Sequence, residues 1–501
     1  MSTKREFNGI ELHRIREHVW EIPQEGEMRV PARVLASEQL LEHISDDNTL
    51  QQLKNATQLP GMTKYALCMP DGHQGYGFPV GGVGATDAET GCISPGAVGF
   101  DINCGVRMIR TSLTYDDVAG RERELVNALF ANVPTGIGGG GIVETDIDTV
   151  EAVLDRGLEW AVEAGYATEA DVLHCEDEGR RPDAVSDFVS QKAKDRGKNQ
   201  LGSLGSGNHF LEVQRVADCY RDDVADAYGL TPHQIVVMIH CGSRGLGHQI
   251  CKDYVSRIES EHPQLLGSLP DSNLIYAPAG SHLAEQYYGA MGAAINFAWV
   301  NRQLITHRTR EVFERVFDRS CEEMGMELVY DVAHNIAKKE THEVGIGPEG
   351  VPAPNGEAVD HECRELYVHR KGATRAFPAG REEVPRAYRD VGQPVLIPGS
   401  MGTGSYVLRG GARSLSETFG STAHGAGRIM SRTQAKRDFG GDDVQRELEG
   451  RRIYVKAESG DTIAEEAPGV YKNVDEVVRV SEELGIGDPV ARTVPVCNIK
   501  G

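Results

Sequence analysis

The chain has 501 residues, of which 40% are hydrophobic, and this is enough apolar material for a sizeable core. Its 75 acidic residues outnumber its 52 basic residues, so the formal net charge is −23. This composition excludes a disordered chain and a surface that binds polyanions everywhere, although clustered arginines can still form one basic cleft. A surface that is acidic and poor in lysine is also typical of proteins adapted to high salt.

The sequence predicts neither a membrane segment nor a disulfide scaffold. It has no run of about 20 apolar residues, and its polar N-terminal stretch lacks a hydrophobic signal core. We therefore expect a cytoplasmic protein. The 10 cysteines are too sparse for a disulfide framework, and no CxxC pair occurs, so most of them should be small buried side chains.

The predicted elements follow one another without a regular strand–helix–strand rhythm. Glycine clusters without a fixed period predict tight turns rather than a solenoid or a propeller. Hydrophobic periodicity and β-branched content predict the elements between them. In chain order these are a helix over 148–166, an acidic surface segment at 176–188, a strand over 234–240, a long helical region over 281–318, a strand over 328–332, a surface loop at 345–361 and a strand over 450–457. We expect one large mixed α+β domain over residues 1–501, not a doubly wound parallel sheet.

Six residues of metal-binding or nucleophilic type stand in Gly-rich turns or at the ends of apolar runs. There is no GxxxxGK[ST] loop and no KxDG string, which excludes a P-loop NTPase and a lysine-nucleophile nucleotidyltransferase. The six residues are Asp101, Cys104, His209, His240, His334 and His424. A thiolate, a carboxylate and several imidazoles suit Mn²⁺, Fe²⁺, Co²⁺ or Zn²⁺. A single histidine at a strand end is more often structural, and spacing alone does not show that these residues converge.

Eight motifs occur in an order that resembles the RtcB family of RNA-splicing ligases, from about residue 60 to the C-terminus. They are PDGHQGYGFPVGG (70–82), GAVGFDINCGVR (96–107), GSLGSGNHFLEV (202–213), HCGSRGLGHQ (240–249), AHN (333–335), HRKGATRAFP (369–378), PGSMGTGSYV (398–407) and HGAGR (424–428).

The resemblance implies an enzyme that joins RNA ends bearing a 2′,3′-cyclic phosphate or a 3′-phosphate to 5′-hydroxyl ends. Such enzymes use GTP and Mn²⁺ and pass through a covalent guanylyl–histidine and an RNA-pp-G end, in tRNA splicing or RNA repair. They are often assisted by a small activator of the archease type. By position His424 is similar to the guanylylated histidine.

The same resemblance assigns further residues by position. Two Mn²⁺ ions would be bound by Asp101, Cys104, His209, His240 and His334, with Cys104 as the natural bridge. Nucleotide contacts would come from Asn208, Glu212, Asn335, Ser400, Ser405, Tyr471 and Lys500. Asp71 and His73 also recur in the family and are expected beside the site, without an assigned role.

Arginine-rich spots are candidates for RNA phosphate, because a guanidinium binds phosphate with two hydrogen bonds. They are Arg244, Arg370, Arg375, Arg428 and Arg432, and the alternative for each is an ordinary ion pair. We expect an Arg-lined cleft beside Cys104 in an otherwise acidic surface. Cys241 follows His240 directly and should point to the opposite face of its strand, into the core.

Two other functions compete with the ligase. A dinuclear metal phosphoesterase would share the metal donors but would need neither GTP nor a nucleophilic His424. A non-catalytic RNA-binding protein would use its metal only for structure.

Overall fold

The computed structural model describes residues 4–136, 140–346 and 360–501. The surface loop expected at 345–361 falls mainly outside them, since positions 347–359 are not described. Its flanks belong to a pair of long antiparallel strands, β13 (Asn335–Ile346) and β14 (Asp360–Lys371).

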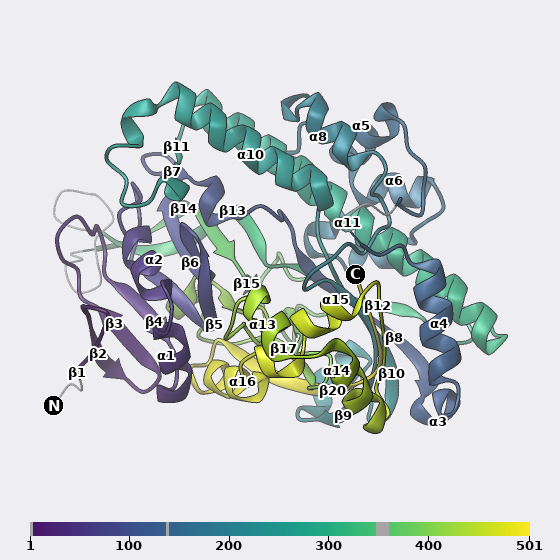
Figure 1. The fold of residues 1–501 in the computed structure, drawn as a ribbon. Coiled ribbons are helices and arrows are strands. Elements are labelled where there is room, and N and C mark those ends of the chain that lie inside the picture. The colour runs from purple at the N-terminus through teal and green to yellow at the C-terminus, as the bar shows by residue number, and fades with distance from the viewer. Residues whose placement is uncertain (1–3, 137–139, 347–359) are drawn as a thin grey trace.

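The first large sheet contains the N-terminal strands and the β13–β14 pair (Figure 1). Its neighbouring strands are antiparallel, apart from the parallel pair β4–β5. Its strand order is β1 (Lys4–Phe7), β2 (Ile10–Arg16), β3 (Val19–Ile22), β4 (Ala32–Leu35), β5 (Ala66–Tyr76), β6 (Phe78–Asp87), β14 and β13.

The second large sheet gathers strands from the middle and the end of the chain. Its order is β12 (Glu327–Ala333), β8 (Gly105–Thr114), β10 (Gln234–Cys241), β9 (Phe210–Cys219), β20 (Gly487–Lys500), β17 (Ser405–Gly410) and β16 (Pro394–Ile397), with β19 (Tyr454–Ala457) parallel to β20. Two short pairs complete the described strands: β7 (Cys92–Ile93) with β11 (Ala277–Pro278), and β15 (Ala373–Arg375) with β18 (Ser421–Ala423).

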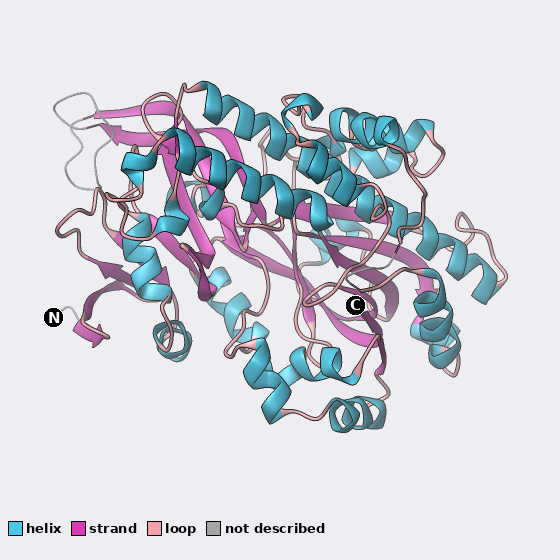
Figure 2. Cartoon of the chain, turned by 45° about the horizontal axis from the view of Figure 1, so that its top comes forward, coloured by secondary structure: helices cyan, strands magenta, loops and turns pink. Residues whose placement is uncertain are grey.

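The helices surround these sheets, and the two longest, α10 and α11, run side by side across the strands (Figures 1 and 2). Among the described helices, none combines the length and apolar character that crossing a membrane requires. The bounds are α1 (Glu38–Ser45), α2 (Thr49–Ala56), α3 (Tyr115–Val118), α4 (Glu122–Asn132), α5 (Ile147–Arg156), α6 (Leu158–Glu163), α7 (Glu169–Leu173), α8 (Gln191–Gly197), α9 (Asp222–Tyr228), α10 (Arg244–Glu261), α11 (His282–Phe317), α12 (Ser414–Thr418), α13 (Arg432–Asp438), α14 (Gly441–Gly450), α15 (Gly460–Glu465) and α16 (Val474–Glu483).

Helix α11 matches the long helical region expected at 281–318. The Ser281 side chain accepts a hydrogen bond from the amide of Ala284, which caps the first turn. Asp318 ends the helix in the left-handed conformation at φ 52°. The helix packs Ile305 and Phe313 against the second sheet, in a core that includes Val237 of β10.

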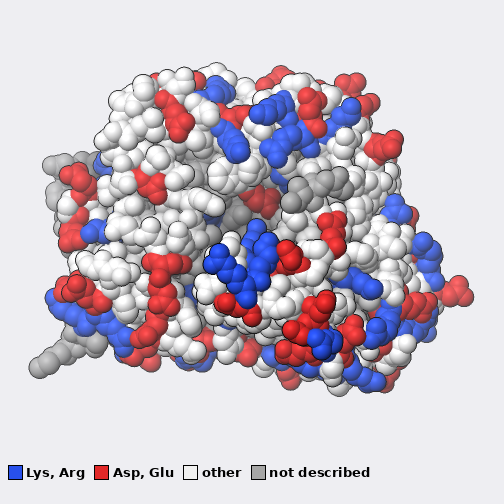
Figure 3. Space-filling view, viewed as in Figure 1, with Lys and Arg blue, Asp and Glu red and all other residues white. Residues whose placement is uncertain are grey.

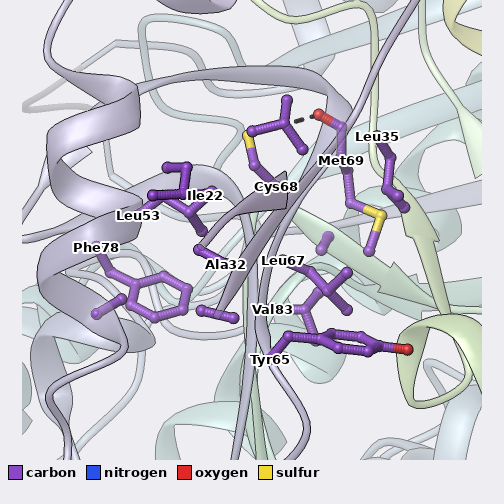
Figure 4. Close-up of a cluster of buried hydrophobic side chains, with 14 of the residues drawn as sticks. Ile22, Ala32, Leu35, Leu53, Tyr65, Leu67, Cys68, Met69, Phe78 and Val83 are labelled. Carbon is purple, nitrogen blue, oxygen red and sulfur yellow. Dashed lines mark hydrogen bonds between the residues drawn. The ribbon is translucent and has the colours of Figure 1, made fainter. Parts of the chain in front are cut away.

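Strand β10 shows how alternation divides the core into two faces. Val236 and Met238 belong to the cluster on one face, whereas Ile235, Val237 and Ile239 belong to the cluster under α4 and α11. The first sheet has its own core, in which Phe78, Leu67 and Val83 pack with Leu53 of α2 (Figure 4).

The mixed α+β fold predicted from the sequence is confirmed, and several local expectations need correction. The expected helix over 148–166 is two helices, because Gly157 takes a φ of 52° and a Cβ there would meet the Gly179 carbonyl oxygen at 2.3 Å. The strand expected over 450–457 is limited to β19, since Gly450 still belongs to α14.

The acidic segment 176–188 is not simply a surface segment. Glu176 is fully buried, and its carboxylate accepts hydrogen bonds from the Lys338 ammonium at 2.7 Å and from the Ala333 amide at 2.9 Å. A buried carboxylate can be stable only with such partners, which lie far away in the sequence.

Candidate active site

The predicted metal-binding residues lie where strands of the second sheet begin or end. Cys104 precedes β8, His209 precedes β9, and His240 lies near the end of β10. The register pairs His240 with both Val106 of β8 and Phe210 of β9, which brings these ends together. His334 stands between β12 and β13, where the chain passes from the second sheet into the first. The cluster therefore lies at the junction of the two sheets.

The donor atoms of these residues converge within hydrogen-bonding distances of one another. The Cys104 thiol lies 3.4 Å from Nε2 of His209 and 3.2 Å from Nε2 of His240. Nε2 of His240 lies 3.3 Å from Nε2 of His334, and Nε2 of His209 lies 2.9 Å from Oδ2 of Asp101. Two overlapping donor groups result, Asp101–Cys104–His209 and Cys104–His240–His334, which share Cys104.

The surroundings of these donors fit a metal ion. His209 donates its Nδ1 proton to the Leu204 carbonyl oxygen at 3.0 Å, which turns Nε2 toward the cluster. Although burial lowers it, the pKa of His209 is raised well above its ordinary value by Cys104, Cys241 and Asp101, and a bound cation would take the place of the proton on Nε2. Burial lowers the pKa of His240 and of His334 well below the ordinary value, which favours neutral imidazoles. Oδ1 of Asp101 is buried without a hydrogen-bond partner among the described residues. A cation would satisfy that oxygen.

Cys104 needs a positive charge to act as a thiolate. Burial, together with the Asp101 charge, raises the pKa of its thiol to about 12. A coordinated metal ion deprotonates a thiol outright.

A buried ion network fixes the segment that carries Cys104. The guanidinium of Arg302, on α11, donates to the carbonyl oxygens of Asn103 and Cys241 at 2.9 and 2.8 Å. Asp331 accepts from Arg302 at 2.7 Å and from Arg107 at 2.7 Å, and all three side chains are fully buried. Sequence reasoning missed this network, because an arginine inside a long helix normally indicates a solvent-exposed face.

His424 lies across a cavity of about 270 Å³ that also exposes Asp101, Cys104, His240 and His334. Its ring centroid is 4.8 Å from that of His334. Oδ2 of Asp71 lies 2.5 Å from Nδ1 of His424 and accepts hydrogen bonds from the amides of His424 and Gly425 at 3.1 and 3.2 Å.

Asp71 therefore holds His424 from behind and leaves Nε2 for reaction. Although burial by itself raises it, the pKa of Asp71 is held below its ordinary value by His424. The neighbouring His73 lines the same cavity and donates to the Asp71 carbonyl oxygen at 3.1 Å. The structure thus gives Asp71 a position that the sequence left without a role.

Part of the predicted nucleotide-binding set also lines the cavity, namely Asn208, Asn335, Tyr471 and Lys500. Behind Tyr471 and Lys500 lies Glu466, a fully buried carboxylate. It is 2.9 Å from Nη1 of Arg428 and 3.3 Å from Nζ of Lys500, and it accepts a short hydrogen bond from the Tyr471 hydroxyl. Glu466 was not among the site residues predicted from the sequence. Its contacts hold Arg428, Tyr471 and Lys500 together in one wall of the cavity.

Glu212, Ser400 and Ser405 lie behind the lining residues. Oε1 of Glu212 accepts from the Gln214 amide at 2.6 Å, and Gln214 also donates to the Ser405 hydroxyl at 3.1 Å. That hydroxyl accepts from the amide of Gly399, which does line the cavity, at 3.0 Å. Their predicted contact with a nucleotide stays a prediction.

The arginine candidates separate into different environments. Arg370 and Arg375 were wrong as candidates for RNA phosphate: both are buried and form ion pairs, Arg370 with Glu340 at 2.6 Å and Arg375 with Glu176 at 3.3 Å. Alternation along β14 turns Arg370 inward and its neighbour Lys371 toward the cavity.

Arg428 and Arg432 line the cavity, and the Arg432 side chain is 52% exposed. Arg244 instead lies behind His209, with Nη1 3.5 Å from Nδ1 of that histidine. Cys241 points away from the cluster as expected, and its thiol donates to the Leu204 carbonyl oxygen at 3.0 Å.

The cavity wall is basic although the chain is acidic. Its lining includes Lys371, Arg428, Arg432 and Lys500, and among the described residues Asp101 is the one carboxylate that lines it. Lys371 was missed as a candidate although it stands in the HRKGATR motif; its Nζ donates to the carbonyl oxygens of Tyr76 and Gly96 at 2.7 and 2.9 Å. Figure 3 shows basic side chains beside a hollow in the molecular surface.

Comparison with known proteins identifies the family of this chain. The family model described as tRNA-splicing ligase RtcB matches residues 52–501. A protein named tRNA-splicing ligase RtcB from Thermococcus kodakarensis is 55% identical over 493 residues, which cover 98% of this chain and 99% of that protein. Proteins of the same name from Aeropyrum pernix and Nanoarchaeum equitans are 49% and 48% identical, each over 98% of this chain and the whole of the relative. The chain belongs to the RtcB family and is an enzyme of the ligase class.

Proposed function

We propose that this enzyme is a GTP- and Mn²⁺-dependent RNA ligase. It joins RNA ends that carry a 2′,3′-cyclic phosphate or a 3′-phosphate to 5′-hydroxyl ends, in tRNA splicing or RNA repair. The observation that carries the proposal is the placement of His424, whose Nδ1 lies 2.5 Å from Oδ2 of Asp71, on the wall of a cavity that also exposes four of the five proposed metal donors. Its substrates are GTP and RNA.

Asp101, Cys104, His209, His240 and His334 would hold the two Mn²⁺ ions of the proposed metal centre. The two donor groups that share Cys104 support this, because they offer the carboxylate, thiolate and imidazole ligands that transition metals bind. Bound Mn²⁺ would neutralise phosphate charge and polarise the phosphorus under attack.

His424 supplies the nucleophile. With Nδ1 protonated and facing the Asp71 carboxylate, Nε2 carries the lone pair that attacks the α-phosphorus of GTP. A bond forms between Nε2 and phosphorus, the bond to the bridging oxygen of the β-phosphate breaks, and pyrophosphate leaves. Asp71 stabilises the positive charge that develops on the imidazole.

The guanylyl group then moves from His424 to the RNA. A cyclic phosphate is first hydrolysed to a 3′-phosphate, whose oxygen attacks the guanylyl phosphorus and releases the histidine as an RNA-pp-G end forms. The 5′-hydroxyl of the second RNA attacks the RNA phosphorus, and GMP leaves. Arg428, Arg432 and, from behind His209, Arg244 are the proposed contacts to RNA phosphate.

The nucleotide is assigned to the cavity wall around Tyr471 and Lys500. A tyrosine ring can stack on guanine, and an ammonium can donate to guanine O6 or N7. Asn208, which also lines the cavity, would contact a phosphate oxygen, and Asn335 would contact the nucleotide as well. Glu212, Ser400 and Ser405 are the further proposed contacts to guanine, and Ser405 accepts a hydrogen bond from the cavity-lining Gly399. We also propose a cytoplasmic location and an activator of the archease type.

The test is covalent labelling with α-labelled GTP and Mn²⁺. We expect an acid-labile label on the native enzyme and on His282→Ala, a substitution at an exposed histidine, and no label on His424→Ala. Removing the metal with a chelator should abolish labelling without changing the circular dichroism of the fold.

The alternative is a dinuclear metal phosphoesterase that acts on RNA ends. The two donor groups that share Cys104 could bind the metal ions of such an enzyme as well. This alternative predicts release of phosphate from a 3′-phosphorylated RNA without GTP and equal activity in His424→Ala. That result, together with an unlabelled native enzyme, would replace the ligase by the phosphoesterase.

A further inference from the structure

A second cavity, of about 510 Å³, lies on the far side of the turn that helps to form the first. Gly399 of this turn lines the candidate active site, whereas Gly402, Thr403 and Gly404 line the second cavity. Along the chain, two residues, Ser400 and Met401, stand between the part of the turn that lines the first cavity and the part that lines the second. None of the predicted site residues lines the second cavity.

Four arginines meet in this cavity, from three parts of the chain. Arg215 comes from β9, Arg492 from β20, and Arg451 and Arg452 from the segment after α14. Their one acidic neighbour in the lining is Asp475, which lies 3.5 Å from Nε of Arg492. Among the described residues, no carboxylate lies within ion-pair distance of Arg215, Arg451 or Arg452.

This concentration of positive charge stands out against the rest of the molecule. The chain has 75 acidic and 52 basic residues, and elsewhere in its described part arginines pair with carboxylates, as Arg310 does with Asp171 and Arg428 with Glu466. Guanidinium groups gathered without carboxylates repel one another, and an anion removes that repulsion. Arg452 also has a left-handed φ of 62°, a conformation that costs energy for a residue other than glycine.

Two of these arginines lie over aromatic rings, and one of the rings, Tyr115, lines the cavity itself. The guanidinium of Arg215 lies over the ring of Tyr115 at 5.3 Å, and that of Arg492 lies over Tyr406 at 5.9 Å. Tyr406 in turn stacks on Tyr220, whose ring centroid is 6.4 Å away and which is 48% exposed. Surfaces that bind single-stranded nucleic acid combine basic groups for phosphates with aromatic rings for bases, and here the exposed ring of Tyr220 adjoins the arginines through the buried Tyr406.

The cavity is also coupled to the active-site turn. Nη2 of Arg451 donates to the Gly402 carbonyl oxygen at 2.5 Å. The Arg492 guanidinium packs so closely on Gly404 that a Cβ there would meet it at 3.0 Å. A ligand held by these two arginines therefore sits directly against the turn that carries Ser400 and precedes Ser405.

We propose that the cavity of Arg215, Arg451, Arg452 and Arg492 binds the phosphate backbone of a single-stranded segment of the RNA substrate, away from the end that reacts. The proposal rests on the proposed function, because it takes the ligand to be the RNA that is ligated. The cavity would hold the strand while its end lies in the active site on the other side of the turn.

The experiment measures binding of a fluorescent, unstructured 20-nucleotide RNA ending in a 3′-phosphate to the full chain, without GTP. The test variant is Arg215→Gln with Arg452→Gln, and the control is Arg123→Gln with Arg446→Gln. The control removes the same charge from side chains that are 66% and 77% exposed and lie outside the cavity. Circular dichroism establishes that each variant is folded.

The loss of two phosphate contacts should weaken RNA binding about 25-fold at about 0.1 M salt. It should also make the slope of the logarithm of the association constant against the logarithm of salt concentration less steep by about 1.4. The control should stay within about twofold of the native enzyme. If the double variant does not fold, Arg452→Gln alone should lose about fivefold.

Equal RNA affinities in the test and control variants would overturn the proposal. Labelling of His424 with GTP in the same preparations separates the two hypotheses. A labelled native enzyme with unchanged RNA affinity in the test variant refutes the second RNA site alone, whereas an unlabelled native enzyme refutes the proposed function.

Discussion

Asp71 is the residue on which the orientation of His424 depends. Asp71→Asn keeps the size of the side chain but removes the negative charge beside Nδ1 and presents an amide that favours the wrong tautomer. We expect guanylylation to slow by roughly 10²- to 10⁴-fold. Rapid-quench labelling with GTP measures the rate, and metal content should be unchanged. A rate within threefold of the native enzyme would contradict this positioning role.

Lys371 is a buried ammonium without a carboxylate partner among the contacts that its Nζ makes. Burial lowers its pKa to about 8. Between pH 8 and 10.5 the unfolded chain therefore binds a proton that the folded chain has lost, so this lysine contributes more stability as pH rises.

Lys371→Met removes that titration. The stability of the native enzyme relative to this variant should rise by about 2 kcal/mol from pH 8 to pH 10. Urea unfolding of both proteins at the two pH values measures the difference, in which the titrations of other groups cancel. A difference that stays constant or falls with pH would show that the ammonium keeps an ordinary pKa.

At the scale of elements, α11 and β12 are joined to the site by the buried Arg107–Asp331–Arg302 network. Although burial opposes it, the charges of Arg302 and Arg107 hold the pKa of Asp331 below its ordinary value. Asp331→Asn leaves two buried guanidiniums without a counter-charge and should lower the free energy of unfolding by about 3–5 kcal/mol.

Chemical unfolding measures that loss. The matched control is Asp443→Asn, which breaks an ion pair whose side chains are 75% and 77% exposed and should change stability by less than about 0.5 kcal/mol. Equal effects of the two substitutions would show that the buried network does not hold the Cys104 segment in place.

The whole molecule carries a net charge of −23, and this charge opposes compaction. Raising KCl from about 0.1 M to about 1 M shortens the screening length from about 10 Å to about 3 Å. We therefore expect the midpoint of thermal unfolding to rise by several degrees. A glucose series of equal osmolality is the control, because glucose is excluded from the protein surface but does not screen charge. A midpoint of thermal unfolding that stays constant or falls as KCl rises would contradict the self-repulsion of the negative charges.

The sequence by itself determined the family, the fold class and most of the residues that meet at the site. Eight motifs were specific because they occur together in one order, and seven of them combine glycine with polar or charged residues. Local periodicity was enough to predict α11, β10 and β12. Alternation along β10 also predicted that Cys241 points away from His240, because side-chain direction in a strand is a local property.

The tertiary structure alone decided which charged groups are partners. Arg370 and Arg375 look like RNA contacts in the sequence, but their ion pairs with Glu340 and Glu176 come from other strands and segments. Glu466 behind Tyr471, Asp71 behind His424 and the four arginines of the second cavity were equally unpredictable. Burial and long-range pairing set the electrostatics of a side chain, and neither is encoded in the residues beside it.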